Sequence, residues 1–593
     1  MGTTAAATQA RVHRVTTLDA ALDALRALET SRWVGFDTET RPDGVGTPRY
    51  KPGLDPYLSA IRLMQLGTAT DAYVLDTGLV DPTPWLWWIK THADRLIVQN
   101  GRFDLAHLQQ MGVFVARVWD TLIADQLLRA GERGGASLGD LSERYLGETM
   151  DKSLQASEWS RELSDDQWEY AGRDVTKLPR LREILAAKLK AQGMERIAQV
   201  EFLAVPAFAM LGRSGFVLDR EQWASLTEAA ESELEEAERQ LHDVLPSPAQ
   251  QMTLFGDGGP GLNLLSPSQV QQALAAMGIE LASTDEHHLK ALDHPVGTLL
   301  LKHREFATRL KMCFRPMPGF VHPVTGRVHA EYWQMAAASG RTASSNPNMQ
   351  QVPREREIRQ CFGVAPGHAL VVADYSQIEL RIVAEESGDE RMIEAFRRGA
   401  DIHRQTAALV TGKNPEEVTK AERQMAKAVN FGICYGMGAS GLVAYAHDAY
   451  GVAMSQAEAE TFRKRYFEAY AGVAKWHHRQ LWRAKKHGGV RTRGGRWRPL
   501  PEPSVTKSTN SPVQGTGADI LKAALGAVAP VAFARGWKLI SEVHDEISLE
   551  VPEEAATDAQ DFLTKTMVEA GRRYLRHVPV EAEANVGRTW ADK

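Results

Sequence analysis

The sequence predicts two regions of different fold class: an α/β domain over about the first 190 residues, followed by a larger α+β domain. In the first region, short strand-like runs such as residues 33–36 alternate with helical patterns, as they do in α/β folds. In the second region, the charged amphipathic stretch 228–245 is typical of a long helix. Strands return at 368–374 and at 537–552, where apolar alternation on both sides of a His-Asp-Glu centre predicts a hairpin.

The composition is that of an ordinary globular protein, with 593 residues, 43% hydrophobic and 24% charged. Its three cysteines, Cys313, Cys361 and Cys434, are too far apart in sequence to suggest a disulfide framework or a zinc site. The N-terminus has no apolar run of signal-peptide length, and no later segment approaches the ~20 apolar residues that a membrane helix needs. We therefore expect a cytoplasmic protein with no membrane partner.

The charge is unevenly distributed. A net charge of −6 argues weakly against nucleic-acid binding, because phosphate contacts need cations. Residues 463–498, however, contain twelve Lys or Arg against one acid, Glu468, with Tyr and Trp interleaved. Such a stripe is either a solvated helix followed by a Gly-rich turn or part of a nucleic-acid surface.

Acidic residues in the first region occupy positions that could bring them together. Asp37 and Glu39 follow a strand-like run, and residues i and i+2 of a strand point to the same side. Ser164 and Gln167 form a capping box that starts a later helix. The candidate site residues are Asp37, Glu39, Asp104, Tyr170 and Asp174. Together they suit a phosphodiesterase with two metals ~3.5–4 Å apart, whereas any one of these acids alone could be a cap or a surface charge.

A second set of residues suggests nucleotidyl transfer. Asp374 ends an apolar strand and Asp545 lies at the tip of the predicted hairpin, which is the minimal protein contribution to two-metal chemistry. Between them, two cations and two aromatics recur every four residues on one helix face: Arg423, Lys427, Phe431 and Tyr435. Cations can hold a triphosphate and aromatics can stack on a base. The alternative is a solvated face and core packing, but an ordinary amphipathic helix would separate these two kinds of residue.

Over about residues 20–185, the ordered acids and tyrosine resemble the DEDD-type 3′→5′ exonucleases, in the subtype with tyrosine in the last motif. The resemblance implies a ribonuclease H-like fold and an active proofreading site. It makes metal ligands of Asp37, Glu39, Asp104 and Asp174, with Tyr170 orienting the attacking water.

Beyond it, DYSQIELR (374–381), RxxxKxxxFGxxYG (423–436) and VHDE (543–546) are similar to motifs A, B and C of family-A DNA polymerases of the bacterial polymerase I type, cellular or phage-encoded. The likeness runs over about residues 201–590 and implies a right-hand fold. The expected division is an exonuclease domain at 1–190 and a polymerase domain at 191–593, with the thumb at about 215–320, the palm at about 321–390 and 501–593, and the fingers at about 391–500.

The polymerase resemblance also assigns roles. Two Mg²⁺ ions would be bound by Asp374, the Tyr375 carbonyl and Asp545, and Glu546 would support this metal site. The exonuclease site would also hold two Mg²⁺ ions, and Mn²⁺ is the alternative ion at both sites. Arg423, Lys427 and His403 would contact the incoming triphosphate, with Lys427 as general acid. The remaining expected contacts to nucleotide or primer-template DNA are Gln377, Glu379, Phe431, Tyr435, Arg341, Gln514, His544 and, near the template, Asn510.

Two positions allow competing interpretations. Ser376 and Glu379 form an S-x-x-E capping box, whereas the resemblance makes Glu379 a steric gate against the ribose 2′-hydroxyl. In the loop 246–261, Gln251, Leu254 and Phe255 resemble the short peptide that binds a sliding clamp, and a local hydrophobic anchor is the alternative.

The sequence therefore predicts a monomeric DNA polymerase that proofreads, acts in replication or repair and lacks a 5′-nuclease domain. Two other hypotheses remain at this stage: an RNA-copying variant of the same scaffold, and a binding scaffold without catalysis. Three departures from the family pattern, Ser339, Thr506 and Thr308, lie near expected DNA contacts.

Overall fold

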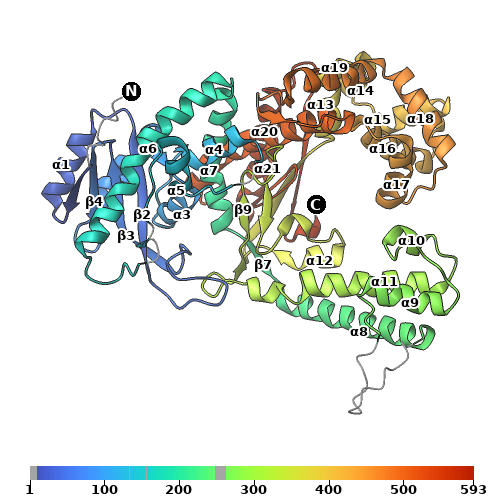
Figure 1. Cartoon of the computed structure of the whole chain (residues 1–593), viewed down its shortest axis with the longest axis horizontal. Coiled ribbons are helices and arrows are strands. Elements are labelled where there is room, and N and C mark those ends of the chain that lie inside the picture. Colours follow the sequence, from blue (N-terminus) through green and yellow to red (C-terminus); the bar gives the residue numbers. More distant parts are fainter. Residues whose placement is uncertain (1–9, 133, 152, 155–156, 247–261, 593) are drawn as a thin grey trace, which may run out of the picture.

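The structure, a computed structural model, describes residues 10–132, 134–151, 153–154, 157–246 and 262–592. Its N-terminal region is built on a six-stranded sheet with the order β1-β4-β3-β2-β5-β6 (Figure 1). β2–β3 and β3–β4 are antiparallel and the other pairs are parallel. The strands are β1 (Arg11–Val15), β2 (Val34–Pro42), β3 (Ser59–Gly67), β4 (Asp71–Asp76), β5 (Leu96–Val98) and β6 (Trp119–Asp120).

Helices α1 (Leu18–Leu28), α2 (Thr83–Thr91), α3 (Arg102–Gln110), α4 (Thr121–Arg129) and α6 (Asp165–Ala191) accompany this sheet. α6 begins with the predicted capping box: the Gln167 amide donates to Ser164 Oγ at 3.3 Å, and the Ser164 amide donates to Gln167 Oε1 at 3.0 Å. The two reciprocal bonds satisfy backbone donors that the first turn leaves open.

Helix α7 (Glu195–Arg213) joins the two regions because it belongs to both cores. Ile197 and Phe202 pack in the core of the N-terminal region, whereas Phe208 and Leu211 pack in the larger core that follows. This buried helix therefore packs the N-terminal region against the rest of the chain.

The second region is built on an antiparallel four-stranded sheet with the order β15-β16-β12-β17. Its strands are β12 (His368–Tyr375), β15 (Lys538–Val543), β16 (Glu546–Pro552) and β17 (Ala582–Gly587). β15 and β16 form the hairpin that the sequence predicted. Helices α13 (Ile378–Ser387), α20 (Val505–Ala534) and α21 (Ala556–Arg572) share the core of this sheet.

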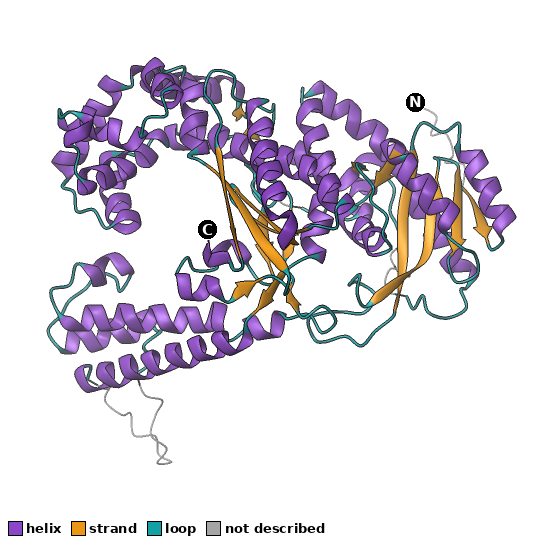
Figure 2. Cartoon of the chain, turned by 180° about the vertical axis from the view of Figure 1, so that it is seen from behind, coloured by secondary structure: helices purple, strands orange, loops and turns teal. Residues whose placement is uncertain are grey.

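Two groups of helices flank the sheet on opposite sides (Figures 1 and 2). One group projects as a long pair with two short helices: α8 (Arg220–Val244), α9 (Pro267–Ala276), α10 (Glu286–Lys290) and α11 (Pro295–Arg309). The other group is α14 (Glu390–Arg397), α15 (Ile402–Thr411), α16 (Lys420–Cys434), α17 (Ala439–Tyr450), α18 (Gln456–Ala469) and α19 (Ala471–His487). α19 leads into the hairpin of β13 (Gly489–Arg491) and β14 (Trp497–Pro499).

Helix α20 is more apolar than we expected from the sequence. It is the one helix among the described residues that is long and apolar enough to cross a membrane. Its buried side chains, which include Ile520, Leu521 and Leu525, belong to the core of the four-stranded sheet. That packing explains the composition, since a helix surrounded by protein needs few polar positions.

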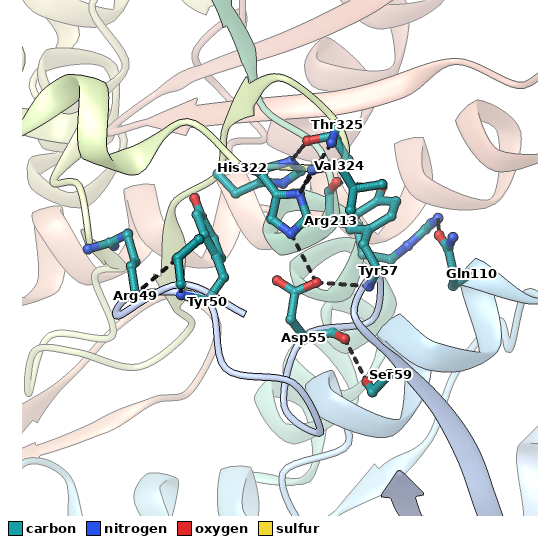
Figure 3. Close-up of polar contacts among 12 residues, drawn as sticks. Arg49, Tyr50, Asp55, Tyr57, Ser59, Gln110, Arg213, His322, Val324 and Thr325 are labelled. Atoms are coloured by element: carbon teal, nitrogen blue, oxygen red, sulfur yellow. Dashed lines mark hydrogen bonds and ion pairs between the residues drawn. The ribbon is translucent and has the colours of Figure 1, made fainter. Parts of the chain in front are cut away.

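A loop that follows β2 docks onto the second region (Figure 3). Tyr57 donates its hydroxyl to the Arg213 carbonyl at 2.9 Å, and His322 Nε2 lies 3.2 Å from Asp55 Oδ1. Tyr50 donates to the Phe320 carbonyl at 2.6 Å. The strand that carries Asp37 and Glu39 is thus tied through its loop to the base of the long helix pair.

Candidate functional sites

The five predicted nuclease residues come from three elements that meet at β2. Asp37 and Glu39 lie on β2, Asp104 on α3, and Tyr170 and Asp174 on α6. A Cβ atom added to Gly35 would lie 2.3 Å from the Val175 carbonyl oxygen. Only glycine at position 35 lets α6 approach β2 this closely, and that approach brings Asp174 to the acids of the strand.

The acids of this site raise one another's pKa values. Burial raises the pKa of Glu39 well above its usual range, and Asp37, Asp174 and Asp104 raise it further. Burial first, then a neighbouring carboxylate, raises the pKa of Asp174 to about 8. These contributions come from neighbouring charges, so the four carboxylates lie near one another at β2.

This donor set fits divalent cations. The carboxylates, of which Asp104 is buried and the other three are half-buried, provide hard oxygen ligands, and positive charge relieves their mutual repulsion. Thr38 donates its hydroxyl to Asp104 Oδ1 at 2.6 Å, which fixes the orientation of that carboxylate. Burial and the neighbouring acids also raise the pKa of Tyr170, so its phenol keeps its proton and can donate to a water or phosphate.

A second site lies in a cavity of about 780 Å³ between the four-stranded sheet and helix α16. Ten of the predicted residues line it: Asp374, Tyr375, Gln377, His403, Arg423, Lys427, Phe431, His544, Asp545 and Glu546. The carboxylates come from the sheet strands and the turn between them, whereas Arg423 and Lys427 come from α16. Such a cavity can hold a polyanion against a metal-binding wall.

The carboxylates of this cavity lie at adjacent strand ends. Asp374 is next to last in β12 and pairs in register with Glu546, the first residue of β16. Asp545 occupies the tight turn before β16, next to His544, whose φ is +62°. Gln377, at the start of α13, has a φ of +55°. A non-glycine residue with a positive φ angle is strained, and such backbone strain concentrates at functional sites.

Two residues that we did not predict hold Arg423 and His403 in place. Asp401, at the start of α15, accepts from Arg423 Nε at 2.6 Å. Asn430 is fully buried and donates from Nδ2 to His403 Nδ1 at 2.9 Å, which leaves the proton of the neutral ring on Nε2. Burial lowers the pKa of His403 to about 4, so the ring acts as a neutral donor.

The other five predicted residues do not line this cavity. Arg341 and Glu379 pair with each other at 2.5 Å, and Gln514 lies one helical turn after Asn510 on α20. The hydroxyl of Tyr435 and the Oδ1 atom of Asn510 are buried without a hydrogen-bond partner in the structure. Such groups are costly unless a ligand satisfies them.

Of the two interpretations of this turn, the capping box at Ser376 is wrong, and the steric-gate role of Glu379 stays a prediction. Gln377 is the N-cap of α13, without a side-chain cap bond. Ser376 donates instead to Glu583 at 3.3 Å, and the Glu379 carboxylate turns to Arg341. Long-range polar partners therefore outcompete the local motif at this turn.

Sequence reasoning also missed four cavity residues. Arg354, Arg356 and Arg359 line it, and the signal was present in the PREREIR stretch that follows the predicted primer contacts. Trp590, near the C-terminus, donates from Nε1 to Glu546 Oε1 at 2.8 Å, and Arg359 lies 4.3 Å from the Trp590 ring centroid. These contacts come from residues far apart in sequence.

The donor set of the second cavity also fits divalent cations. Asp374 and Asp545 offer carboxylate oxygens at neighbouring strand ends. The cations that line the same cavity could bind the phosphates of a polyphosphate.

The fold and the two acidic sites define the class of the protein: a polymerase built from a palm sheet flanked by helical fingers and thumb, joined to a nuclease domain. Residues 225–592 match DNA polymerase family A, and residues 12–190 match the 3'-5' exonuclease family. The chain therefore belongs to DNA polymerase family A and carries a 3′–5′ exonuclease domain, as the sequence motifs predicted.

Curated relatives and a solved structure agree with this assignment. The chain is 34% identical to DNA polymerase I of Aquifex aeolicus over 596 residues, which cover 96% of this chain and 97% of that protein. It is 31% identical to DNA polymerase I of Pseudomonas aeruginosa, over 98% of this chain and 66% of that protein. The POL domain of Pol1 from M. smegmatis, in complex with DNA primer-template and dNTP, superimposes with a TM-score of 0.80 at 26% identity. That match covers 98% of this chain and 99% of the other.

The predicted clamp-binding residues, Gln251, Leu254 and Phe255, lie outside the described residues. Clamp binding therefore stays a prediction, as do the monomeric state, the absence of a 5′-nuclease domain and the domain boundaries.

Proposed function

We propose that this DNA polymerase extends a primer on a DNA template by two-metal nucleotidyl transfer and removes mispaired 3′ ends at a separate two-metal site. One observation carries the proposal: Asp374 and Asp545, at the ends of the sheet strands, and Arg423 and Lys427, on α16, line one cavity. Carboxylates that could hold metal ions and cations that could hold a triphosphate therefore share a single cavity.

In this proposal Asp374 and Asp545 would hold two Mg²⁺ ions, which when bound would lower the pKa of the attacking 3′-hydroxyl and neutralise charge on the departing pyrophosphate. Arg423, held by Asp401, binds phosphate oxygens, and His403 donates from Nε2. Lys427 acts as the general acid and donates a proton to the leaving pyrophosphate. The primer-template and deoxynucleotide partners are supported by the ligands of the similar M. smegmatis structure.

At the nuclease site, Asp37, Glu39, Asp104 and Asp174 would hold the metals, and Tyr170 would orient the attacking water. The position of Tyr170 supports this role, because it lies one helical turn before Asp174 on α6 and its phenol can donate a hydrogen bond near neutral pH.

Primer extension and primer degradation, each measured with Mg²⁺, test the proposal. We expect Asp374→Ala to lose extension and keep degradation, and Asp37→Ala combined with Glu39→Ala to do the reverse. Asp561→Ala, which removes an exposed acid of α21, is the matched control and should keep both activities.

A wild-type protein that binds primer-template but never extends it would contradict the proposal and favour a non-catalytic scaffold. Extension on an RNA template as fast as on DNA would instead favour the RNA-copying variant. Loss of both activities in Asp374→Ala would mean that the two sites are not independent.

A further inference from the structure

A second cleft, of about 500 Å³, is lined almost entirely by arginine. Its lining residues come from α7, α13, α19, the β13–β14 turn and the segment after α21. Helices α13 and α19 lie on the opposite side of the four-stranded sheet from helix α8 (Figure 1). The lining residues of the cleft are Arg196 of α7, Glu386 of α13, Arg479 and Arg483 of α19, Arg493 of the β13–β14 turn, and Arg573, Tyr574 and Arg576 after α21. The proposed catalytic roles use none of them.

Most of this positive charge is uncompensated. Arg493 pairs with Glu385 at 3.0 Å and with Glu386 at 3.3 Å. Within the described part of the chain, the other five arginines of the cleft form no ion pair. Guanidinium groups stay charged at any physiological pH. Five like charges around one cleft repel one another, and a bound polyanion would remove that repulsion.

Some of these arginines are held in place without losing charge. Arg479 Nη2 donates to the Glu386 carbonyl at 3.0 Å, and Arg196 Nη2 donates to the Arg573 carbonyl at 3.2 Å. Backbone carbonyls orient a guanidinium but leave its positive charge available. The cleft is therefore preorganised for phosphate, which arginine binds through paired N–H groups.

The adjoining face of α19 indicates what kind of phosphate compound binds. Arg479, Trp482, Arg483 and Lys486 stand at positions i, i+3, i+4 and i+7, which lie on one helix face. Trp482 is 56% exposed, an unusual position for so large an apolar side chain, and Lys486 Nζ lies 4.6 Å from its ring centroid. Cations beside an exposed aromatic ring bind single-stranded nucleic acid, whose bases are free to stack. Inorganic polyphosphate has no base to stack, and a duplex hides its base faces.

We propose that the arginine cleft and this face of α19 bind the single-stranded template ahead of the catalytic cavity. The arginines would contact phosphates, and Trp482 would stack on a base. The inference rests on the proposed polymerase function and extends it to a second template site. α13 connects the two sites, because Gln377 at its start lines the catalytic cavity and Glu386 near its end lines the arginine cleft. Nine residues of helix span about 13 Å.

The affinity for primer-templates with short and long single-stranded template overhangs tests the proposal. At ~3.4 Å per nucleotide, an overhang of about two nucleotides does not cross that distance, whereas one of about fifteen does. We expect wild type to bind the long overhang more tightly. Arg479→Ala combined with Arg483→Ala should remove this gain in affinity, which we expect to be about tenfold. The slope of log Kd against log salt concentration should fall by about 1.4, because two phosphate contacts are lost.

Two further variants separate phosphate contact from stacking. Trp482→Ala should weaken binding of the normal long overhang but not of an abasic one, which has no bases to stack. Lys485→Ala combined with Arg572→Ala removes two exposed cations close to the cleft but outside its lining, so it should behave as wild type. Single-nucleotide addition on the short overhang reports on the catalytic cavity independently, and the Arg479 and Arg483 variant should retain it.

Three results would overturn the proposal. Wild type could bind both overhangs equally, or the control pair could lose as much affinity as Arg479→Ala with Arg483→Ala. Alternatively, the cleft variant could lose binding of inorganic tripolyphosphate while keeping its gain on the long overhang, which would assign the cleft to a free polyphosphate. Failure of nucleotide addition by wild type on the short overhang would instead refute the proposed function.

Discussion

Lys522→Met tests whether a buried charge network holds the polymerase domain together. Lys522 is fully buried in α20, and its Nζ donates to Glu201 Oε1 and to the Gly340 carbonyl, each at 2.7 Å. Arg496 and Asp519 complete the network and are likewise buried, with 2.7 Å between Arg496 Nη2 and Asp519 Oδ1. Two cations and two anions therefore balance in a site without water access.

Removing Lys522 leaves this network with one excess negative charge. Burial alone would raise the pKa of Glu201, but Lys522 and Arg496 outweigh it and lower the pKa, so Glu201 is ionised and depends on its partners. Loss of one member of a buried pair costs about 3–5 kcal/mol. Methionine has a similar length, so the cavity contribution is small. With about 400 residues in the unfolding unit, this is a fall in Tm of about 4–6 °C.

The assay is thermal unfolding followed by calorimetry, with Lys538→Met as the matched control. Lys538 also lies 2.7 Å from a glutamate, Glu550, but its side chain is 42% exposed and Arg327 still pairs with Glu550. Exposed pairs contribute about 0–1 kcal/mol, so the control should lose about 1 °C or less. Equal shifts in the two variants would refute the reasoning. Adding Glu201→Gln to Lys522→Met should recover part of the loss, because the charges then balance again.

Three further predictions concern other residues. Thr38→Val removes the 2.6 Å bond that orients Asp104, so primer degradation should fall about tenfold or more while extension is unchanged; an unchanged degradation rate would count against this role. Asn430→Leu removes the donor to His403, and single-turnover kinetics should show a raised apparent Kd for deoxynucleotide with normal exonuclease activity. The lowered pKa of Glu201 contributes stability that is present above about pH 4.3 and lost as pH falls further; Glu201→Gln should flatten that acid limb in pH-dependent unfolding.

The sequence predicted those features that depend on local patterns. The hairpin of β15 and β16 and the strand that ends near Asp374 follow from period-2 alternation. The capping box of α6 follows from residues three positions apart. Asp37, Glu39, Asp374 and Asp545 could be named because each lies at or after a strand-like run, whereas residues such as His403, Asn510 and Gln514 were named only through the resemblance to family-A polymerases.

Features that depend on distant partners could not be predicted in this way. Lys522 in the apolar sequence of α20 was a signal that a buried anion must exist, but its partner Glu201 is 321 residues away. The same limit explains the wrong capping box, since Ser376 and Glu379 look complete locally and yet bind Glu583 and Arg341. Local pattern gives the donors and acceptors, whereas only the fold decides which of them meet.

The net charge of −6 conceals an ordered division of charge between the sites. The proposed exonuclease site is acidic, so metal ions would have to neutralise it before a phosphate chain could approach. The proposed catalytic cavity is lined by both cations and carboxylates, so it would combine metal binding with direct attraction of a triphosphate. The arginine cleft has little acid and attracts phosphate with protein charges alone. A cleft focuses the electric field of the charged side chains that line it. The total charge of the chain therefore does not determine where DNA binds, and nucleic-acid surfaces must be sought in the distribution of charge.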